Sequence, residues 1–224
     1  MENAMNDQAK AYAAARQTLR DAELSLMRQR EAVAELRRGL PTDPRAADYT
    51  FVEGPPELSA GDAPVRAVPL SDLFTRPEQP LLLYHFMLGK AQTQPCPMCT
   101  LWTTGFNAIA EHLAEHANLA IACAATIGEL RGLARRHEWS RLRLLSCDDN
   151  AFKADFGSED EDGRQRPAIS VFTRNPDGGV VHRYTSGIAL ADDVRERGLD
   201  LLNPLWHLLD LTPKGRGAWY PSIV

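Results

Sequence analysis

The sequence lacks several features that would assign it to common protein classes. It contains no second close pair of cysteines to complete the four ligands of a zinc site. No apolar stretch approaches the length of a membrane span, and residues 1–40 contain no continuous apolar core of the signal-peptide kind. We therefore expect no metal, no cofactor, no membrane contact and a cytoplasmic location.

Excess positive charge is also missing. The chain of 224 residues has 25 Lys and Arg against 30 Asp and Glu, a net charge of -5, whereas nucleic-acid-binding domains usually carry a basic face. Four cysteines are present, and a reducing compartment keeps most thiols free. This composition predicts a soluble protein without a nucleic-acid partner, with one working thiol pair and two core cysteines.

The most informative motif is Cys96-Pro97-Met98-Cys99, which follows an apolar run and precedes a helical pattern. If Cys96 caps the helix, Cys99 lies one turn further on the same face, close enough for a disulfide. Proline is favoured at the first helical position, and the positive helix N-terminus lowers the pKa of a thiol there. The motif predicts Cys96 as nucleophile and Cys99 as resolving thiol; zinc ligation and a purely structural pair are the alternatives.

The N-terminal segment has an apolar heptad pattern. Its positions are Tyr12, Leu19, Leu26, Val33 and Leu40, and they predict an amphipathic helix of about four heptads. The stripe has two interpretations: a coiled-coil homodimer arm, or a helix that packs on its own domain. We divide the chain into a helical arm, residues 1–44, and a domain, residues 45–224.

From residue 81 onward, strand and helix patterns alternate, which predicts parallel strands with crossover helices. The expected strands cover residues 49–52, 65–68, 81–88, 119–123, 142–146, 168–174 and 180–185, and the expected helices cover residues 97–116, 127–139 and 192–211. The run Asn175-Pro176-Asp177-Gly178-Gly179 predicts a hairpin between the last two strands. We expect residues 49–80 to form an irregular lead-in, and Pro204 to kink the last helix.

This order of elements around a C-x-x-C motif resembles the thioredoxin fold, an α/β fold with a central mixed sheet flanked by helices. The resemblance implies a cis-proline that faces the cysteines, and Pro167 occupies the matching position. A cis X-Pro bond costs only about 0.5–1 kcal/mol. An ordinary trans proline at the start of a strand is the alternative.

A narrower resemblance covers nearly the whole chain. The sequences at residues 36–41, 84–87, 96–99, 137–140, 155–157 and 209–216 are similar to those of the bacterial thioredoxin-like family called "domain of unknown function 899". The resemblance implies a dithiol-disulfide oxidoreductase whose substrate is unassigned. From the chemistry of the cysteine pair we expect a thiol or disulfide substrate, in a protein or a small molecule.

The sequence departs from these two patterns near the cysteines. Tyr84 stands where thioredoxin has a buried aspartate, so either His85 or a water moves the proton of the resolving thiol, or the second step is slow. Ala124 stands where the narrower family tends to have an arginine, which leaves Lys90 as the nearest cation in sequence. Trp102 shares a helix face with Cys99 and either lines the site or packs in the core.

Thr93 lies three residues before Cys96, the spacing with which peroxiredoxins bind a peroxide, but Gly89 replaces the proline of that pattern. A peroxiredoxin-like thiol peroxidase is therefore the second hypothesis, and a redox-inert binding module with the same fold is the third. Cys123 and Cys147 are interpreted as buried core thiols. If Pro167 faces the cysteines, the acidic loop at residues 158–163 lies near the site and raises the thiolate pKa.

Overall fold

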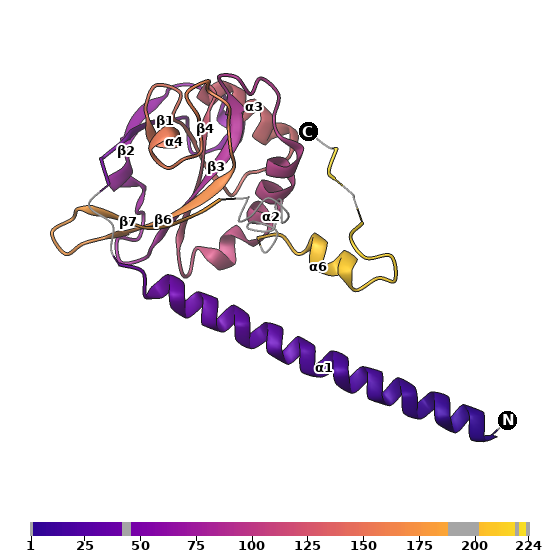
Figure 1. The fold of residues 1–224 in the computed structure, drawn as a ribbon. Helices are drawn as coiled ribbons and strands as arrows, with labels where there is room; N and C mark the ends of the chain where they lie inside the picture. Colours follow the sequence, from indigo (N-terminus) through magenta and orange to yellow (C-terminus); the bar gives the residue numbers. More distant parts are fainter. Residues whose placement is uncertain (1, 42–45, 188–201, 218–219, 223–224) are drawn as a thin grey trace. The chain divides into compact units, whose positions relative to one another are not determined.

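The computed structural model describes residues 2–41, 46–187, 202–217 and 220–222 (Figure 1). Two short 3-10 helices, Leu58–Ala60 and Leu70–Leu73, accompany the main elements. The helices are α1 (Glu2–Arg38), α2 (Pro97–Leu113), α3 (Ile127–Arg136), α4 (Phe152–Asp155) and α6 (Leu205–Asp210), and the strands are β1 (Thr50–Glu53), β2 (Arg66–Pro69), β3 (Leu81–Gly89), β4 (Asn118–Ala124), β5 (Arg143–Ser146), β6 (Ala168–Arg174) and β7 (Val180–Gly187).

Contacts divide the chain into two units, Met1–Pro41 and Thr42–Val224. The first unit is the helix α1, whose heptad side chains, among them Leu19 and Leu26, are exposed in the single chain. The homodimer and the packing of this helix on its own domain both stay predictions. No helix among the described residues combines the length and apolarity that crossing a bilayer requires.

The second unit is built on one seven-stranded sheet in the order β2-β1-β5-β4-β3-β6-β7. Strands β3, β4 and β5 are parallel, whereas β6 and β7 add antiparallel to β3. The fold is the mixed thioredoxin-like α/β architecture that the resemblance implied. The segment expected to be an irregular lead-in contributes more than predicted, because β1 pairs with β5 and extends the sheet by two strands.

The sheet separates two apolar layers. One contains α2 and α3, with Tyr84, Phe86, Trp102 and Trp139 among its buried side chains; the other contains α4 and Phe152 (Figure 1). Successive side chains of a strand point to opposite faces. Each residue of β3 is therefore committed to one layer by its position alone.

Local sequence sets the helix boundaries beside the sheet. Thr126 and Glu129 form a reciprocal capping box at the start of α3: Glu129 N–H donates to Thr126 Oγ1 at 3.3 Å and Thr126 N–H donates to Glu129 Oε2 at 3.0 Å. The first half of the last helix expected from the sequence, residues 192–201, lies outside the described residues. Its described part is α6, which begins directly after Pro204.

Candidate active site: two cysteines at the start of α2

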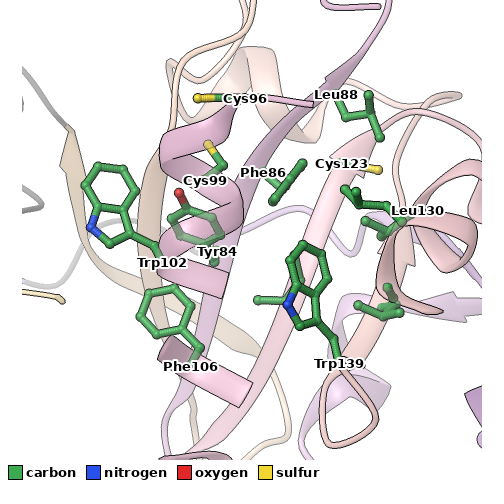
Figure 2. Packing of buried hydrophobic residues seen from close by; sticks show 14 of the residues in the cluster. Tyr84, Phe86, Leu88, Cys96, Cys99, Trp102, Phe106, Cys123, Leu130 and Trp139 are labelled. Carbon is green, nitrogen blue, oxygen red and sulfur yellow. The ribbon is translucent and has the colours of Figure 1, made fainter. Parts of the chain in front are cut away.

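The cysteine pair lies where β3 passes into α2. Cys96 is the N-cap residue in extended conformation and Pro97 is the first helical residue, as the sequence predicts. The Cys96 N–H donates to the carbonyl oxygen of Met87 at 3.3 Å, which fixes the helix start against the end of β3. Both thiols are free and lie in the first turn of α2 (Figure 2).

The loop between strand and helix begins with a close approach of two backbones. Gly89 has a φ of 101°, and a Cβ atom built there would lie 2.0 Å from the carbonyl oxygen of Ala124. No larger residue fits, because the conformation is left-handed and the space is filled. Gly89 thus holds the end of β3 against the end of β4, directly before the segment that leads to Cys96.

The environment of Cys96 favours its ionised form. The side chain of Cys99 lowers the pKa of Cys96 most; burial opposes this, and the backbone N–H groups of Cys99 and Met98 and the Tyr220 hydroxyl lower it further, from 9.0 to about 6. These backbone donors belong to the unpaired N–H groups that every helix start presents. Cys96 therefore has the properties of a nucleophilic thiolate.

Cys99 has the opposite properties. Its side chain is fully buried, and burial raises its pKa well above 9.0, with the neighbouring Cys96 acting in the same direction. The Tyr84 hydroxyl and the Met87 N–H counteract this increase in part. One turn of helix thus holds a thiolate that is 8% exposed and a neutral thiol that is fully buried.

Two aromatic residues predicted for the site lie in the α2 layer. The Tyr84 hydroxyl is buried and directed toward the Cys99 sulfur (Figure 2), without forming a complete hydrogen bond to any described residue. Trp102 is fully buried and contacts Tyr84 edge-on, with ring centroids 6.4 Å apart. Trp102 supports Tyr84 from below, so that Tyr84 is the aromatic side chain that meets the thiols.

His85 does not face the cysteines. Its ring stacks on Phe152 at 4.8 Å, and its Nε2 is hydrogen-bonded to Ser170 Oγ at 2.8 Å on the other side of the sheet. Burial lowers its pKa well below 6.5, and Lys153 and His182 act in the same direction. The expectation that His85 moves the proton of the resolving thiol is corrected: this histidine belongs to the opposite layer.

Pro167 is buried at the start of β6. Its peptide bond is trans, since Ala63-Pro64 is the one cis bond among the described residues, so the expected cis form is wrong. Ala168 pairs with His85, and the antiparallel register carried one step further brings Pro167 level with Phe86. Pro167 therefore lies beside the part of β3 that leads to the cysteine loop. Its peptide bond is trans instead of cis.

The other predicted residues lie around the loop. Thr93 is exposed. Lys90 forms an ion pair with Glu159, and Arg164 donates to Asp162 at 2.6 Å. These ion pairs offset much of the negative charge of the acidic loop, so we no longer expect the loop to raise the pKa of Cys96. Lys90 is paired with Glu159 and is therefore not a free cation beside the thiolate.

Cys123 and Cys147 are core thiols, as predicted. They end the neighbouring strands β4 and β5, and burial raises the pKa of each to about 12. The Cys147 thiol donates to the carbonyl oxygen of Cys123 at 3.1 Å. Both thiols are inert at neutral pH, since only a thiolate is nucleophilic.

Two residues of the site escaped the sequence analysis. Tyr220 belongs to the C-terminal tail, where the next residue, Pro221, is buried. Lys153 lies in α4 with its side chain buried. Neither stands in a motif or a periodic pattern, and only the folded chain brings them to the cysteine loop.

The chain was compared with known proteins. The model of the family described as "Bacterial protein of unknown function (DUF899)" matches residues 1–222. No curated protein matches.

Three solved structures illustrate the similarity in the course of the chain. Peroxidoxin BcpB from Mycobacterium tuberculosis is 17% identical over 73% of this chain and 94% of its own, with a TM-score of 0.46. AhpC from Mycobacterium bovis is 15% identical over 81% of this chain and 98% of its own, with a TM-score of 0.47. Reduced Prx3 from Vibrio vulnificus, solved in complex with H2O2, is 12% identical over 65% and 88%, with a TM-score of 0.46. With a family model matched over almost its full length, the chain belongs to the bacterial family DUF899.

Proposed function

We propose that this chain is a dithiol-disulfide oxidoreductase in which Cys96 attacks and Cys99 resolves. The observation that carries the proposal is the placement of two free thiols in one helical turn, with Cys96 at the N-cap of α2 and Cys99 fully buried. This placement lowers the pKa of Cys96 to about 6 and raises that of Cys99. A thiolate reacts with disulfides, whereas a neutral buried thiol waits until a mixed disulfide forms beside it.

In the first step the Cys96 thiolate attacks one sulfur of a substrate disulfide. A bond forms between Cys96 and that sulfur, the substrate S–S bond breaks, and the other half of the substrate leaves as a thiolate. In the second step Cys99 loses its proton and attacks Cys96. The Cys96–Cys99 disulfide forms, and the remaining half of the substrate leaves as a thiolate that takes up a proton.

The Met98 and Cys99 N–H groups have a role in both directions of this exchange. They stabilise negative charge on Cys96, which makes it a good leaving group when an external dithiol reduces the Cys96–Cys99 disulfide. The substrate class is a thiol or disulfide, carried by a protein or a small molecule. The 8% exposure of Cys96 favours a substrate that presents its disulfide on a protruding, narrow segment.

The test is a comparison of the wild type with Cys96→Ser and Cys99→Ser in reaction with 5,5′-dithiobis(2-nitrobenzoate). We expect the wild type to release two equivalents of thionitrobenzoate in two phases. Cys99→Ser should release one and retain a mixed disulfide that mass spectrometry assigns to Cys96, and Cys96→Ser should react slowly. A Cys96→Ser variant that reacts as fast as the wild type would contradict the proposal and favour a redox-inert module.

The same variants separate disulfide exchange from peroxidase activity. The rate of Cys96 oxidation is measured with hydrogen peroxide and with an aromatic disulfide at equal concentration. Disulfide exchange predicts the faster reaction with the disulfide, because Thr93 is exposed and Gly89 replaces the proline of the peroxiredoxin pattern. A much faster reaction with peroxide would instead support the peroxidase.

A further inference from the structure

The cysteine loop has a buried cation behind it. Lys153 is 1% exposed, and its Nζ donates to the carbonyl oxygen of Phe86 at 2.7 Å. Among the ion pairs of the described residues none involves Lys153, so no carboxylate neutralises its charge directly. Burial of an unpaired ammonium group is costly and lowers its pKa, which makes a lysine at this position unusual for a purely structural side chain.

The acceptor of Lys153 is part of the cysteine site. The Phe86 carbonyl and the Met87 N–H belong to one trans peptide group and therefore point in opposite directions. The carbonyl accepts from the Lys153 Nζ, the N–H lowers the pKa of Cys99, and the next carbonyl, that of Met87, accepts from the Cys96 N–H. One short backbone segment thus connects the cation in the α4 layer with the Cys99 thiol and with the backbone of Cys96.

This segment is available because β3 leaves its ladders there. Pairing with β6 is recorded as far as His85, and pairing with β4 is interrupted between His85 and Gly89. A regular ladder would direct these peptide groups to the neighbouring strands. Because the pairing is interrupted, the peptide groups of residues 86 and 87 can interact with Lys153 and the cysteines instead.

Several charged or titratable groups face Lys153. The thiols of Cys147, Cys123 and Cys99 and the carboxylate of Glu159 each raise its pKa, and Lys153 in turn contributes to the low pKa of His85. Cys123 and Cys147 stay protonated and take no part in exchange. Cys99 is the thiol of this group that must acquire negative charge during a catalytic cycle.

We propose that Lys153 is a positioning residue for the resolution step, whose ammonium group polarises the Phe86–Met87 peptide and stabilises the Cys99 thiolate as it forms. The inference rests on the proposed dithiol-disulfide exchange. In that step Cys99 gives up its proton, its sulfur bonds to Cys96, and the substrate sulfur leaves and takes up a proton. Lys153 neither gains nor loses a bond; it acts through the peptide and through its charge.

The expected change in the rate of resolution follows from two opposing effects of the Lys153 charge, on the pKa of Cys99 and on the nucleophilicity of its thiolate. An opposite charge nearby lowers a pKa by about one to two units, which changes the thiolate fraction about tenfold to a hundredfold. A thiolate of lower pKa is less nucleophilic by about half that amount on a logarithmic scale. Loss of the charge should therefore slow resolution about threefold to tenfold.

The experiment follows the two phases of thionitrobenzoate release in the full chain. The first phase, attack by Cys96, depends on reagent concentration, and the second, attack by Cys99 on the mixed disulfide, does not. At pH 7 we expect Lys153→Met to leave the first phase unchanged within about twofold and to slow the second about threefold to tenfold. The difference should shrink as the pH rises, because Lys153 then loses its own charge.

Control variants separate the charge from the fold. Lys90→Met removes a cation that is paired with Glu159 and should leave both phases unchanged. Lys153→Arg keeps the charge, whereas Lys153→Gln keeps only a hydrogen-bond donor. The second phase should therefore be faster in Lys153→Arg than in Lys153→Gln. This comparison tests the role of the charge if Lys153→Met does not fold. Equal second phases in Arg and Gln variants, or an unaltered second phase in Lys153→Met, would overturn the role of Lys153. A wild type without a first phase would instead overturn the disulfide exchange itself.

Discussion

Ionisation of Cys96 should make the stability of the protein depend on pH in a defined window. The pKa of Cys96 is lowered from 9.0 to about 6 in the folded state, so folding favours the thiolate. A lowered pKa contributes stability that is complete above the unfolded pKa and disappears as the pH falls through the folded pKa. The wild type should therefore gain stability between pH 6 and pH 9 relative to a variant without this thiol.

The magnitude follows from linkage. With these two pKa values the thiolate contributes about 1 kcal/mol at pH 7 and about 3 kcal/mol at pH 8, and less than about 0.5 kcal/mol at pH 6. Cys96 is 8% exposed, so solvent screening removes little of this effect. Above pH 9 the raised pKa of Cys99 acts in the opposite direction, which limits the useful window.

The assay is urea unfolding of the reduced wild type and Cys96→Ser at pH 6, 7 and 8. The fluorescence of the buried Trp102 and Trp139 reports the domain without interference from α1. Cys147→Ala is the matched control, because burial raises the pKa of this thiol to about 12 and its contribution should not change over this range. A wild-type advantage over Cys96→Ser that is equal at all three pH values would refute the lowered pKa of Cys96.

Three further predictions concern single residues. Tyr220→Phe removes a hydroxyl that lowers the pKa of Cys96. We expect the pKa of Cys96, measured by thiolate absorbance, to rise by less than about one unit, since Tyr220 is 47% exposed. An unchanged pKa would show that Tyr220 does not act on Cys96. Arg131→Met removes a buried guanidinium that donates to four backbone carbonyls, and urea unfolding should show a loss of about 2–3 kcal/mol; a loss below about 0.5 kcal/mol would contradict this role. Gly89→Ala forces a Cβ onto the Ala124 carbonyl at a positive φ, and should lower the midpoint of thermal unfolding together with the rate of disulfide exchange, in contrast to the equivalent change at the open Gly157.

Local patterns in the sequence determine the elements that carry the cysteines. The apolar run at residues 81–88 becomes β3, and the order Cys96-Pro97 places the helix start where it is found, because proline excludes the competing positions. The hairpin at residues 175–179 likewise follows from turn chemistry. These features depend on a few neighbouring residues, and for that reason one sequence suffices to predict them.

These local patterns do not determine which face of the sheet carries the cysteine site. The period of two along a strand already forbids Tyr84 and His85 from facing the same thiol, and the structure assigns the thiol to Tyr84. Which layer receives α2 is decided by tertiary packing. The sequence around Pro167 is compatible with a cis or a trans bond, and the structure has the trans form.

Lys153 and Tyr220 belong to the part of the site that no sequence pattern predicts. Lys153 is the single basic residue of the four-residue helix α4, and Tyr220 lies in a tail without periodicity. A lysine in a short helix is ordinarily a solvated surface residue. Its burial depends on the path of β3, which ends its pairing just where the ammonium group arrives.

The interrupted pairing at the end of β3 has a consequence for experiments on this protein. The interactions of residues 86 and 87 with the Cys99 thiol, the Cys96 backbone and Lys153 are made by amide and carbonyl groups. Alanine scanning leaves such groups in place, so substitutions of Phe86 and Met87 would report on packing and overlook the electrostatic part. Replacing the amide between these two residues by an ester, through semisynthesis, would delete the N–H donor while every side chain stays the same.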